Sequence, residues 1–247
     1  MEVMFLDAAY TGKVKLNQAT LDYITKKKYR KIGLYASVQF CNQLAEVEEQ
    51  LHKLKLELVT SQPDRTHVKG QLLGCDNYHN SLNLNQDVDC YLYVGDGRFH
   101  PLALVYLQKD NPQLKEVICN DPISNKMTLM GVKDIETILK KYRGSLIKFL
   151  SADIIGVIST IKPGQEQLRP SFQLEKKYPG KKFYYFIDNT VSFDNLENFN
   201  FIEVWVNTAC PRIGFDDQEK FLLGVINLND ALEAKEILSQ DSLFNRQ

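Results

Sequence analysis

The sequence GDGRFHP follows an apolar run and gathers several side chains that can take part in binding or catalysis. Gly95 and Gly97 would allow backbone amides to approach a ligand closely, because glycine has no Cβ atom. Arg98 and His100 are residue types that act on a carboxylate or a phosphate group. The simpler interpretation is a sharp turn in which Asp96 caps the segment that follows. Taken alone, these residues support the binding site and the turn equally.

The chain contains five cysteines, an odd number that argues against the disulfide framework of a secreted protein. Cys75 ends the segment GQLLGC and Cys210 lies in NTACPRIG, so each has a glycine or a proline beside it. Such neighbours open backbone amides and expose a sulfur to a metal or an iron–sulfur cluster. Cys90 and Cys119 lie inside apolar runs and are predicted to be core residues. Cys41 opens a helical pattern and is compatible with either role.

Several common catalytic and nucleotide-binding motifs are absent from the sequence. There is no CxxC pair, so a zinc ribbon is excluded. There is no Walker loop, and GDGRF lacks the third glycine of a dinucleotide-binding GxGxxG. A GxSxG elbow and an HExxH pair are absent as well. The ordinary hydrolase and nucleotide-binding classes are therefore disfavoured.

Length and composition indicate a globular protein without a large charged surface. The 247 residues suffice for one large domain or two small ones. A net charge of -1 gives no basic field that would hold nucleic acid. The start MEVMFLDAAY is too short and too acidic for a signal peptide, and no apolar stretch approaches membrane-spanning length. We therefore expect a cytoplasmic protein that binds neither nucleic acid nor membrane.

Short apolar runs alternate with helical patterns, which predicts an α/β fold with right-handed crossovers. Several runs are nearly continuous in apolar residues, as expected for strands of a parallel sheet that are buried on both faces. The predicted strands span residues 3–8, 31–37, 56–61, 89–95, 102–107, 116–120, 153–160, 182–188 and 201–207. The helical patterns span residues 17–27, 38–54, 132–150 and 230–238.

A weak internal repeat divides the chain into two related α/β units with parallel sheets. KIGLYASVQF and DIIGVISTIKPGQ are both apolar strands that end in Ser or Thr, with a Gln soon after. We predict units at residues 31–144 and 145–247, packed together, after a short strand–helix segment at residues 1–30. In an open parallel sheet, ligands bind beyond the carboxyl ends of the strands. Four polar segments are therefore expected on one rim: residues 37–39, 95–100, 159–165 and 207–212.

The segments KIGLYASVQF, GQLLGC, VDCYLYVGDGRFHPLAL, NDPISNK, GVISTIKPGQ and NTACPRIGFDD occur in this order. Together they resemble the diphthamide-synthesis family, the archaeal and eukaryotic 2-(3-amino-3-carboxypropyl)histidine synthases. The resemblance covers nearly the whole chain from about residue 30, and GDGRFHPLAL with ACPRIGFDD is its most specific part. Family members have three homologous α/β domains. The resemblance implies that the two predicted units are the second and third of these.

The resemblance implies a radical transferase that uses a 4Fe-4S iron–sulfur cluster and S-adenosylmethionine. In the family, one cysteine from each domain holds the cluster, and S-adenosylmethionine binds the remaining iron. Its cleavage yields a 3-amino-3-carboxypropyl radical that adds to a histidine of translation elongation factor 2. Cys75 and Cys210 match the ligands of the second and third domains. The residues expected to contact S-adenosylmethionine are Gln39, Gly95, Asp96, Gly97, Arg98, His100, Lys162, Gln165 and Arg212.

The resemblance also implies that the family's first domain and its cysteine have no counterpart in these residues. The third cluster ligand is expected from Cys41, which follows the rim segment SVQF, from Cys90 or Cys119, or from another chain. Alternatively, the protein has left the original chemistry. Such a protein would bind a cluster weakly or not at all. A rival function is that of a non-catalytic paralogue, a binding or electron-relay partner of a full-length family member. A third is a shortened enzyme that uses the same cofactor chemistry on a different acceptor. Because family members dimerise, we expect a homodimer or a heterodimer.

Overall fold

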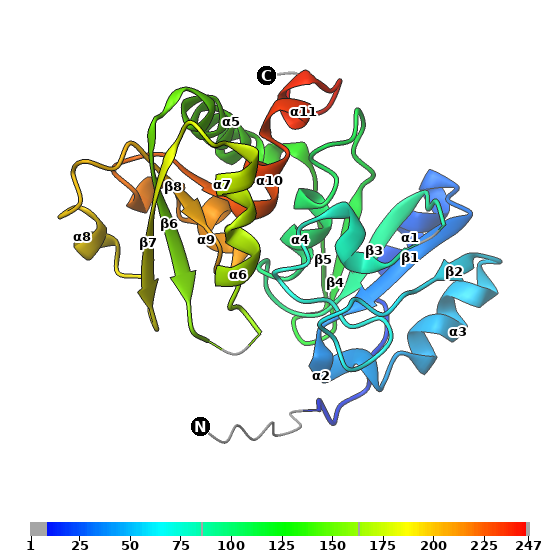
Figure 1. The fold of residues 1–247 in the computed structure, drawn as a ribbon. Helices are drawn as coiled ribbons and strands as arrows, with labels where there is room; N and C mark the ends of the chain where they lie inside the picture. The colour runs from blue at the N-terminus through cyan, green and yellow to red at the C-terminus, as the bar shows by residue number, and fades with distance from the viewer. Residues whose placement is uncertain (1–8, 85, 163, 246–247) are drawn as a thin grey trace. The chain divides into compact units, whose positions relative to one another are not determined.

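The structure, a computed structural model, describes residues 9–245 apart from residues 85 and 163 (Figure 1). It forms two compact units, one of Met1–Gln108 with Gln113–Asp134 and one of Lys109–Pro112 with Ile135–Gln247. The strand expected at residues 3–8 lies outside the described residues. The correspondence of residues 31–144 and 145–247 to two family domains, with residues 1–30 before them, stays a prediction.

Within the described residues, the first unit contains a five-stranded sheet of order β2-β1-β3-β4-β5 (Figure 1). The first four strands are parallel, and β5 runs antiparallel to β4. The strands are β1 (Lys31–Ala36), β2 (Glu57–Val59), β3 (Cys90–Val94), β4 (Val117–Asp121) and β5 (Lys126–Met130). The helices are α1 (Gln18–Lys27), α2 (Val38–Cys41), α3 (Ala45–Lys53) and α4 (Pro101–Tyr106), with short 3-10 turns η1 (His79–Leu82) and η2 (Val132–Asp134).

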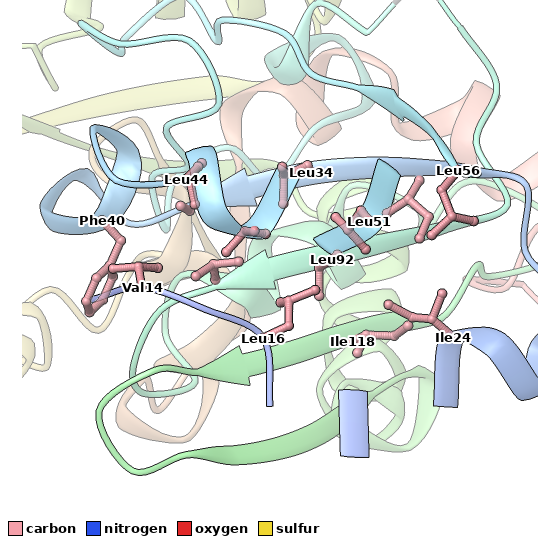
Figure 2. Packing of buried hydrophobic residues seen from close by; sticks show 14 of the residues in the cluster. Val14, Leu16, Ile24, Leu34, Phe40, Leu44, Leu51, Leu56, Leu92 and Ile118 are labelled. Atoms are coloured by element: carbon pink, nitrogen blue, oxygen red, sulfur yellow. The ribbon is translucent and has the colours of Figure 1, made fainter. Parts of the chain in front are cut away.

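One face of this sheet carries the hydrophobic core that Figure 2 shows. Leu34 of β1 and Leu92 of β3 belong to it and are at most 1% exposed. Ile24 of α1 and Leu51 of α3 pack into the same cluster. Side chains alternate between the two faces of a strand, so Tyr35, which follows Leu34 in β1, points to the opposite face. Tyr35 is buried as well. Burial on both faces is why this strand is a continuous apolar run in the sequence.

Within the described residues, the second unit contains a four-stranded parallel sheet of order β7-β6-β8-β9. Its strands are β6 (Ile154–Thr160), β7 (Lys182–Asp188), β8 (Val204–Asn207) and β9 (Val225–Asn227). Its helices are α5 (Glu136–Ser151), α6 (Leu168–Ser171), α7 (Gln173–Lys177), α8 (Phe193–Leu196), α9 (Pro211–Asp216), α10 (Leu228–Leu232) and α11 (Ala234–Ser239), with the 3-10 turn η3 (Gln218–Lys220). Helix α5 packs on β8, β9 and α9.

The α/β fold expected from the sequence is confirmed, but the strand expected at residues 102–107 is wrong. This segment is helix α4, which begins at Pro101 in the first helical position, where proline is well accepted. Ala103, Leu104, Val105 and Tyr106 are all 0% exposed. A short helix buried on every side has the same continuous apolar sequence as a buried strand. Among the described residues, no helix combines the length and apolar composition that crossing a membrane requires.

Gly144 lies on the exposed side of α5, where a Cβ atom would meet nothing within 4 Å. Because alanine restricts the unfolded chain and suits a helix better, Gly144→Ala should stabilise the second unit by about 0.5–1 kcal/mol. Urea unfolding followed through Trp205, the single tryptophan of the chain, measures this effect. An unchanged or lower unfolding midpoint would contradict the prediction.

Candidate functional site

The carboxyl ends of β1 and β3 bring two of the predicted rim segments together. The amide of Gln39 donates a hydrogen bond to the carboxylate of Asp96 over 3.0 Å. Behind this pair, the Ser37 N–H donates to the Val94 carbonyl oxygen. Parallel neighbours end at the same edge of a sheet, which is why segments 57 residues apart meet here.

The local structure of the GDGRFHP segment requires glycine at both position 95 and position 97. A Cβ atom on Gly95 would lie 2.5 Å from the phenolic oxygen of Tyr93, so only glycine fits under that ring. Gly97 has a φ of +66°, in the left-handed region that favours glycine. The Gly95 N–H donates to the carbonyl oxygen of Asn120, which ties the segment to β4. The segment is therefore a fixed turn, and its binding role stays a prediction.

Arg98 and His100 lie at the outer part of this turn. The guanidinium of Arg98 forms an ion pair with Asp134, and its side chain is 65% exposed. His100 precedes helix α4, and its ring packs edge-on against Phe99 with the ring centroids 5.5 Å apart. The positive charge of Arg98 is thus partly compensated within the first unit.

Cys75 reaches the same rim by an irregular route. Residues 70–72 run beside the last residue of β1: the Ala36 N–H donates to the Gly70 carbonyl, and the Leu72 N–H donates to the Ala36 carbonyl. A Cβ atom on Gly74 would lie 2.1 Å from Phe99 Cε1, so the Phe99 ring lies directly on the residue before Cys75. The partly exposed Cys75 therefore adjoins the GDGRFHP turn.

Two buried polar residues that follow Cys75 were missed by the sequence analysis. Asp76 accepts the Leu73 N–H at 2.8 Å, and burial raises the pKa of its carboxyl to about 6. Asn77 is 0% exposed, and neither polar atom of its side chain has a hydrogen-bond partner among the described residues. Buried polar groups are normally hydrogen-bonded, so Asn77 marks an unusual environment beside Cys75. Asp and Asn after a cysteine would have been the only sequence signal.

Cys41 lies at the end of α2, near the first rim segment. Its thiol donates a hydrogen bond to the Ser37 carbonyl oxygen at 3.3 Å. Burial raises the pKa of this thiol to about 11, so its neutral form is favoured at physiological pH. Its assignment as third cluster ligand stays a prediction.

Cys210 occupies the N-cap position of α9, directly after β8. The Asn207 amide donates to the Cys210 carbonyl oxygen at 2.9 Å, and its side-chain oxygen accepts the Ala209 N–H at 3.1 Å. The side chain of Asn207 thus holds both ends of the turn. Cys210 is partly exposed. Cys210 therefore lies at the end of a turn that hydrogen bonds of the Asn207 side chain close.

The remaining predicted residues lie in two segments of the second unit. Arg212 is 4% exposed, and its Nε donates to the Asp216 carboxylate at 2.7 Å, one helical turn away. Lys162 is exposed in the turn after β6, where its carbonyl oxygen accepts the Gln165 N–H at 3.0 Å. Of these, Lys162 is the cation that faces solvent.

The thiols of Cys75 and Cys210 suit the donor chemistry of an iron–sulfur cluster, because both are partly exposed and cysteine sulfur is the usual ligand of such clusters. Across the described ranges, no group of three or more His, Cys, Asp or Glu residues is arranged to hold a metal ion. The structure thus fits a cluster in the type and exposure of two ligands.

In the metal-free protein, the thiols of Cys75 and Cys210 should react with maleimide much faster than those of Cys90 and Cys119. Burial raises the pKa of Cys90 and that of Cys119 each to about 12, and the thiolate is the nucleophile. We expect maleimide to label both at least about tenfold more slowly than Cys75 or Cys210, at pH 7 and at pH 9 alike. Peptide mapping by mass spectrometry measures each site, and urea should remove the difference. Equal rates in the folded protein would contradict the prediction.

Comparison with known proteins places these features in one family. The model of the diphthamide synthesis protein family matches residues 2–240. A curated relative, the 2-(3-amino-3-carboxypropyl)histidine synthase of Pyrococcus horikoshii, is 32% identical over 195 residues, which cover 78% of this chain and 53% of the relative. Subunit 1 of the synthase from Eremothecium gossypii is 25% identical over 220 residues, covering 87% of this chain and 49% of the relative. The chain spans about half the length of these curated relatives.

Two solved structures share the fold. The crystal structure of Dph2 from Pyrococcus horikoshii with a 4Fe-4S cluster has a TM-score of 0.74 and 27% identity, covering 94% of this chain and 67% of that chain. A second crystal structure of Dph2 from the same organism has a TM-score of 0.70 and 28% identity, covering 90% of this chain and 62% of that chain. A relative with this fold therefore carries a 4Fe-4S cluster.

Proposed function

The chain belongs to the diphthamide synthesis protein family, and on that premise we propose that it is an iron–sulfur, S-adenosylmethionine-dependent transferase or a subunit of one. It would move a 3-amino-3-carboxypropyl group from S-adenosylmethionine to a histidine of translation elongation factor 2, the first step of diphthamide biosynthesis. An elongation factor as substrate implies a cytoplasmic location. A homodimer, or a heterodimer with a family paralogue, is part of the same proposal.

One observation carries this proposal on the structural side. The Phe99 ring of the GDGRFHP turn lies on Gly74, so the candidate ligand Cys75 adjoins the turn that is proposed to bind the cofactor. The proposed cluster ligand and the turn proposed to bind S-adenosylmethionine therefore belong to the same compact unit, which supports the proposal.

The proposed roles follow from the chemistry of each group. Cys75 and Cys210 would hold the cluster, which when bound supplies the electron for cleavage of S-adenosylmethionine. The Gln39–Asp96 pair offers an amide and a carboxylate to the polar groups of the cofactor. Lys162 is better suited than Arg212 to pair with the methionyl carboxylate, because Asp216 already neutralises the guanidinium.

The direct test is anaerobic transfer to purified elongation factor 2 by the reconstituted, dithionite-reduced protein. We expect the mass of one elongation-factor peptide that contains a histidine to rise by one 3-amino-3-carboxypropyl group. The Cys75→Ser variant should lose the product. Cys90→Ser should retain it, because the complete burial of this side chain disfavours a role as third cluster ligand. Absence of product with wild-type protein, together with no increase in product when it is added to a full-length family member, would refute the proposal.

A second candidate function is that of a non-catalytic partner of a full-length family member. The edge strand β7 favours it, since Tyr184 and Ile187 are 43% and 54% exposed on this strand. An edge strand with unpaired backbone groups and exposed apolar side chains offers a surface on which another chain can pair. In this case the chain would raise the activity of the full-length member, and Cys75→Ser would leave that increase unchanged.

A further inference from the structure

A chain of buried polar side chains lies behind the Cys210 loop in the second unit. We call it the Asp230 network; its members are Lys109, Asp230, Tyr142, Asn227 and Asn207. Each member is at most 3% exposed. Polar groups at this depth are stable only while their hydrogen bonds are made, so each link restricts the next.

The network begins at a buried ion pair. The ammonium group of Lys109 lies 3.0 Å from one carboxylate oxygen of Asp230 and donates to Asp110 at 2.6 Å. Burial by itself lowers the pKa of Lys109, but the two carboxylates raise it overall, so the residue stays charged. The second carboxylate oxygen of Asp230 accepts the hydroxyl hydrogen of Tyr142. Because the Tyr142 hydroxyl donates its hydrogen to Asp230, its oxygen is left to accept a hydrogen bond from another group.

From Tyr142 the network continues to the Cys210 loop. The phenol oxygen accepts the backbone N–H of Asn227 at 2.7 Å. The Asn227 amide donates to the Pro211 carbonyl at 3.0 Å, and its side-chain oxygen accepts from Asn207 at 2.8 Å. Asn207 in turn donates to the carbonyl oxygen of Cys210.

Helix α9, which follows Cys210, has a glycine where the Asn227 side chain packs against it. A Cβ atom on Gly214 would lie 2.1 Å from the Asn227 side-chain oxygen, so a larger residue would push the helix away from Asn227. The Tyr142 ring also packs on Phe215, with centroids 4.7 Å apart. The phenol thus contacts α9 with its ring and holds Asn227 with its hydroxyl group.

We propose that Tyr142 and Asp230 are positioning residues for the Cys210 thiol. Asp230 fixes the direction of the phenol, and the phenol fixes Asn227. Asn227 then fixes the turn that carries the cysteine, by way of the Pro211 carbonyl and Asn207. The inference rests on the proposed function only in giving Cys210 the role of a cluster ligand. Partners behind a ligand commonly set its orientation in metal sites.

Thiol labelling of the metal-free protein tests the positioning directly. Tyr142→Phe removes one hydroxyl group and keeps the ring. We expect maleimide to label Cys210 about fivefold faster in this variant, because the loop opens more often. Labelling of Cys75, in the first unit, should not change. The matched control is Tyr178→Phe, which also removes a buried phenol bond of the second unit, to the Ala231 carbonyl.

The outcomes separate positioning from general destabilisation. Equal Cys210 labelling in wild type and Tyr142→Phe would overturn the inference, and so would an equal increase in Tyr178→Phe. If Tyr142→Phe fails to fold, Asn227→Ser is tested in its place. This substitution removes the amide that donates to the Pro211 carbonyl. Unchanged Cys210 labelling in Asn227→Ser would also overturn the inference.

A second readout uses the reconstituted protein. Tyr142→Phe should lose iron to a chelator about tenfold more readily than Tyr178→Phe. Equal loss from the two variants would contradict the inference. If wild-type protein takes up no iron at all, the proposed function fails, while the labelling result still decides whether the network positions the Cys210 thiol.

Discussion

Replacing Lys109 by methionine should destabilise the second unit by about 3–5 kcal/mol, the usual cost of removing one partner of a buried ion pair. The side chains of Lys109 and Asp230 are 2% and 3% exposed, so water does not replace the lost ammonium group. Methionine has a similar length and fills most of the same space. The expected loss is therefore electrostatic and does not come from a cavity.

Urea unfolding followed by Trp205 fluorescence measures this effect, because Trp205 is buried in the same unit. The control is Lys177→Met, which removes a lysine paired with Glu236 at the surface of the second unit, over 3.4 Å. Solvent-exposed pairs contribute little, so the control should leave the midpoint nearly unchanged. An equally small effect for Lys109→Met would show that the buried pair is not a stabilising element.

Replacing Gly156 by alanine should destabilise the second unit by about 1–3 kcal/mol through overpacking. A Cβ atom there would lie 2.3 Å from two ring carbons of Trp205 on the neighbouring strand. That ring is confined, since Phe186 packs on it edge-on with the centroids 5.0 Å apart. The indole must therefore shift or the strands must separate.

Thermal unfolding by circular dichroism gives the stability of this variant, and the emission of Trp205 reports the shift of the ring. Gly180→Ala serves as the control, because a Cβ atom at that position meets nothing within 4 Å. A Gly156→Ala protein with wild-type stability and emission would contradict the packing that the structure shows at β6 and β8.

The elements that could be predicted from the sequence are those whose environment is uniform along their length. β1, β3 and β6 are continuous apolar runs because both of their faces are buried, and α1 has an asparagine cap at Asn17 that accepts the Thr20 N–H. β5 and β9 were missed, since β5 is largely exposed and β9 has only three residues. The pattern at residues 38–54 predicts one helix, but the structure forms two, α2 and α3.

The candidate site was predictable where parallel strands end and not where the chain is irregular. The contact between Gln39 and Asp96 follows from the adjacency of two strands. The route that brings Cys75 to the same rim has no periodicity, so only the structure shows it. Asn227 was missed for another reason: its part in the Cys210 loop depends on long-range bonds to Tyr142 and Asn207.

The most direct test of the central claim is anaerobic iron and sulfide analysis, combined with an electron paramagnetic resonance spectrum of the dithionite-reduced protein. We expect wild type to hold a cluster whose signal shifts when S-adenosylmethionine is added. Cys75→Ser and Cys210→Ser should lose the signal. Cys119→Ser should keep it, because the burial of this strand residue disfavours a role as third cluster ligand. A wild-type protein without iron and sulfide, or a signal that survives in both ligand variants, would contradict the claim that these two thiolates hold a cluster.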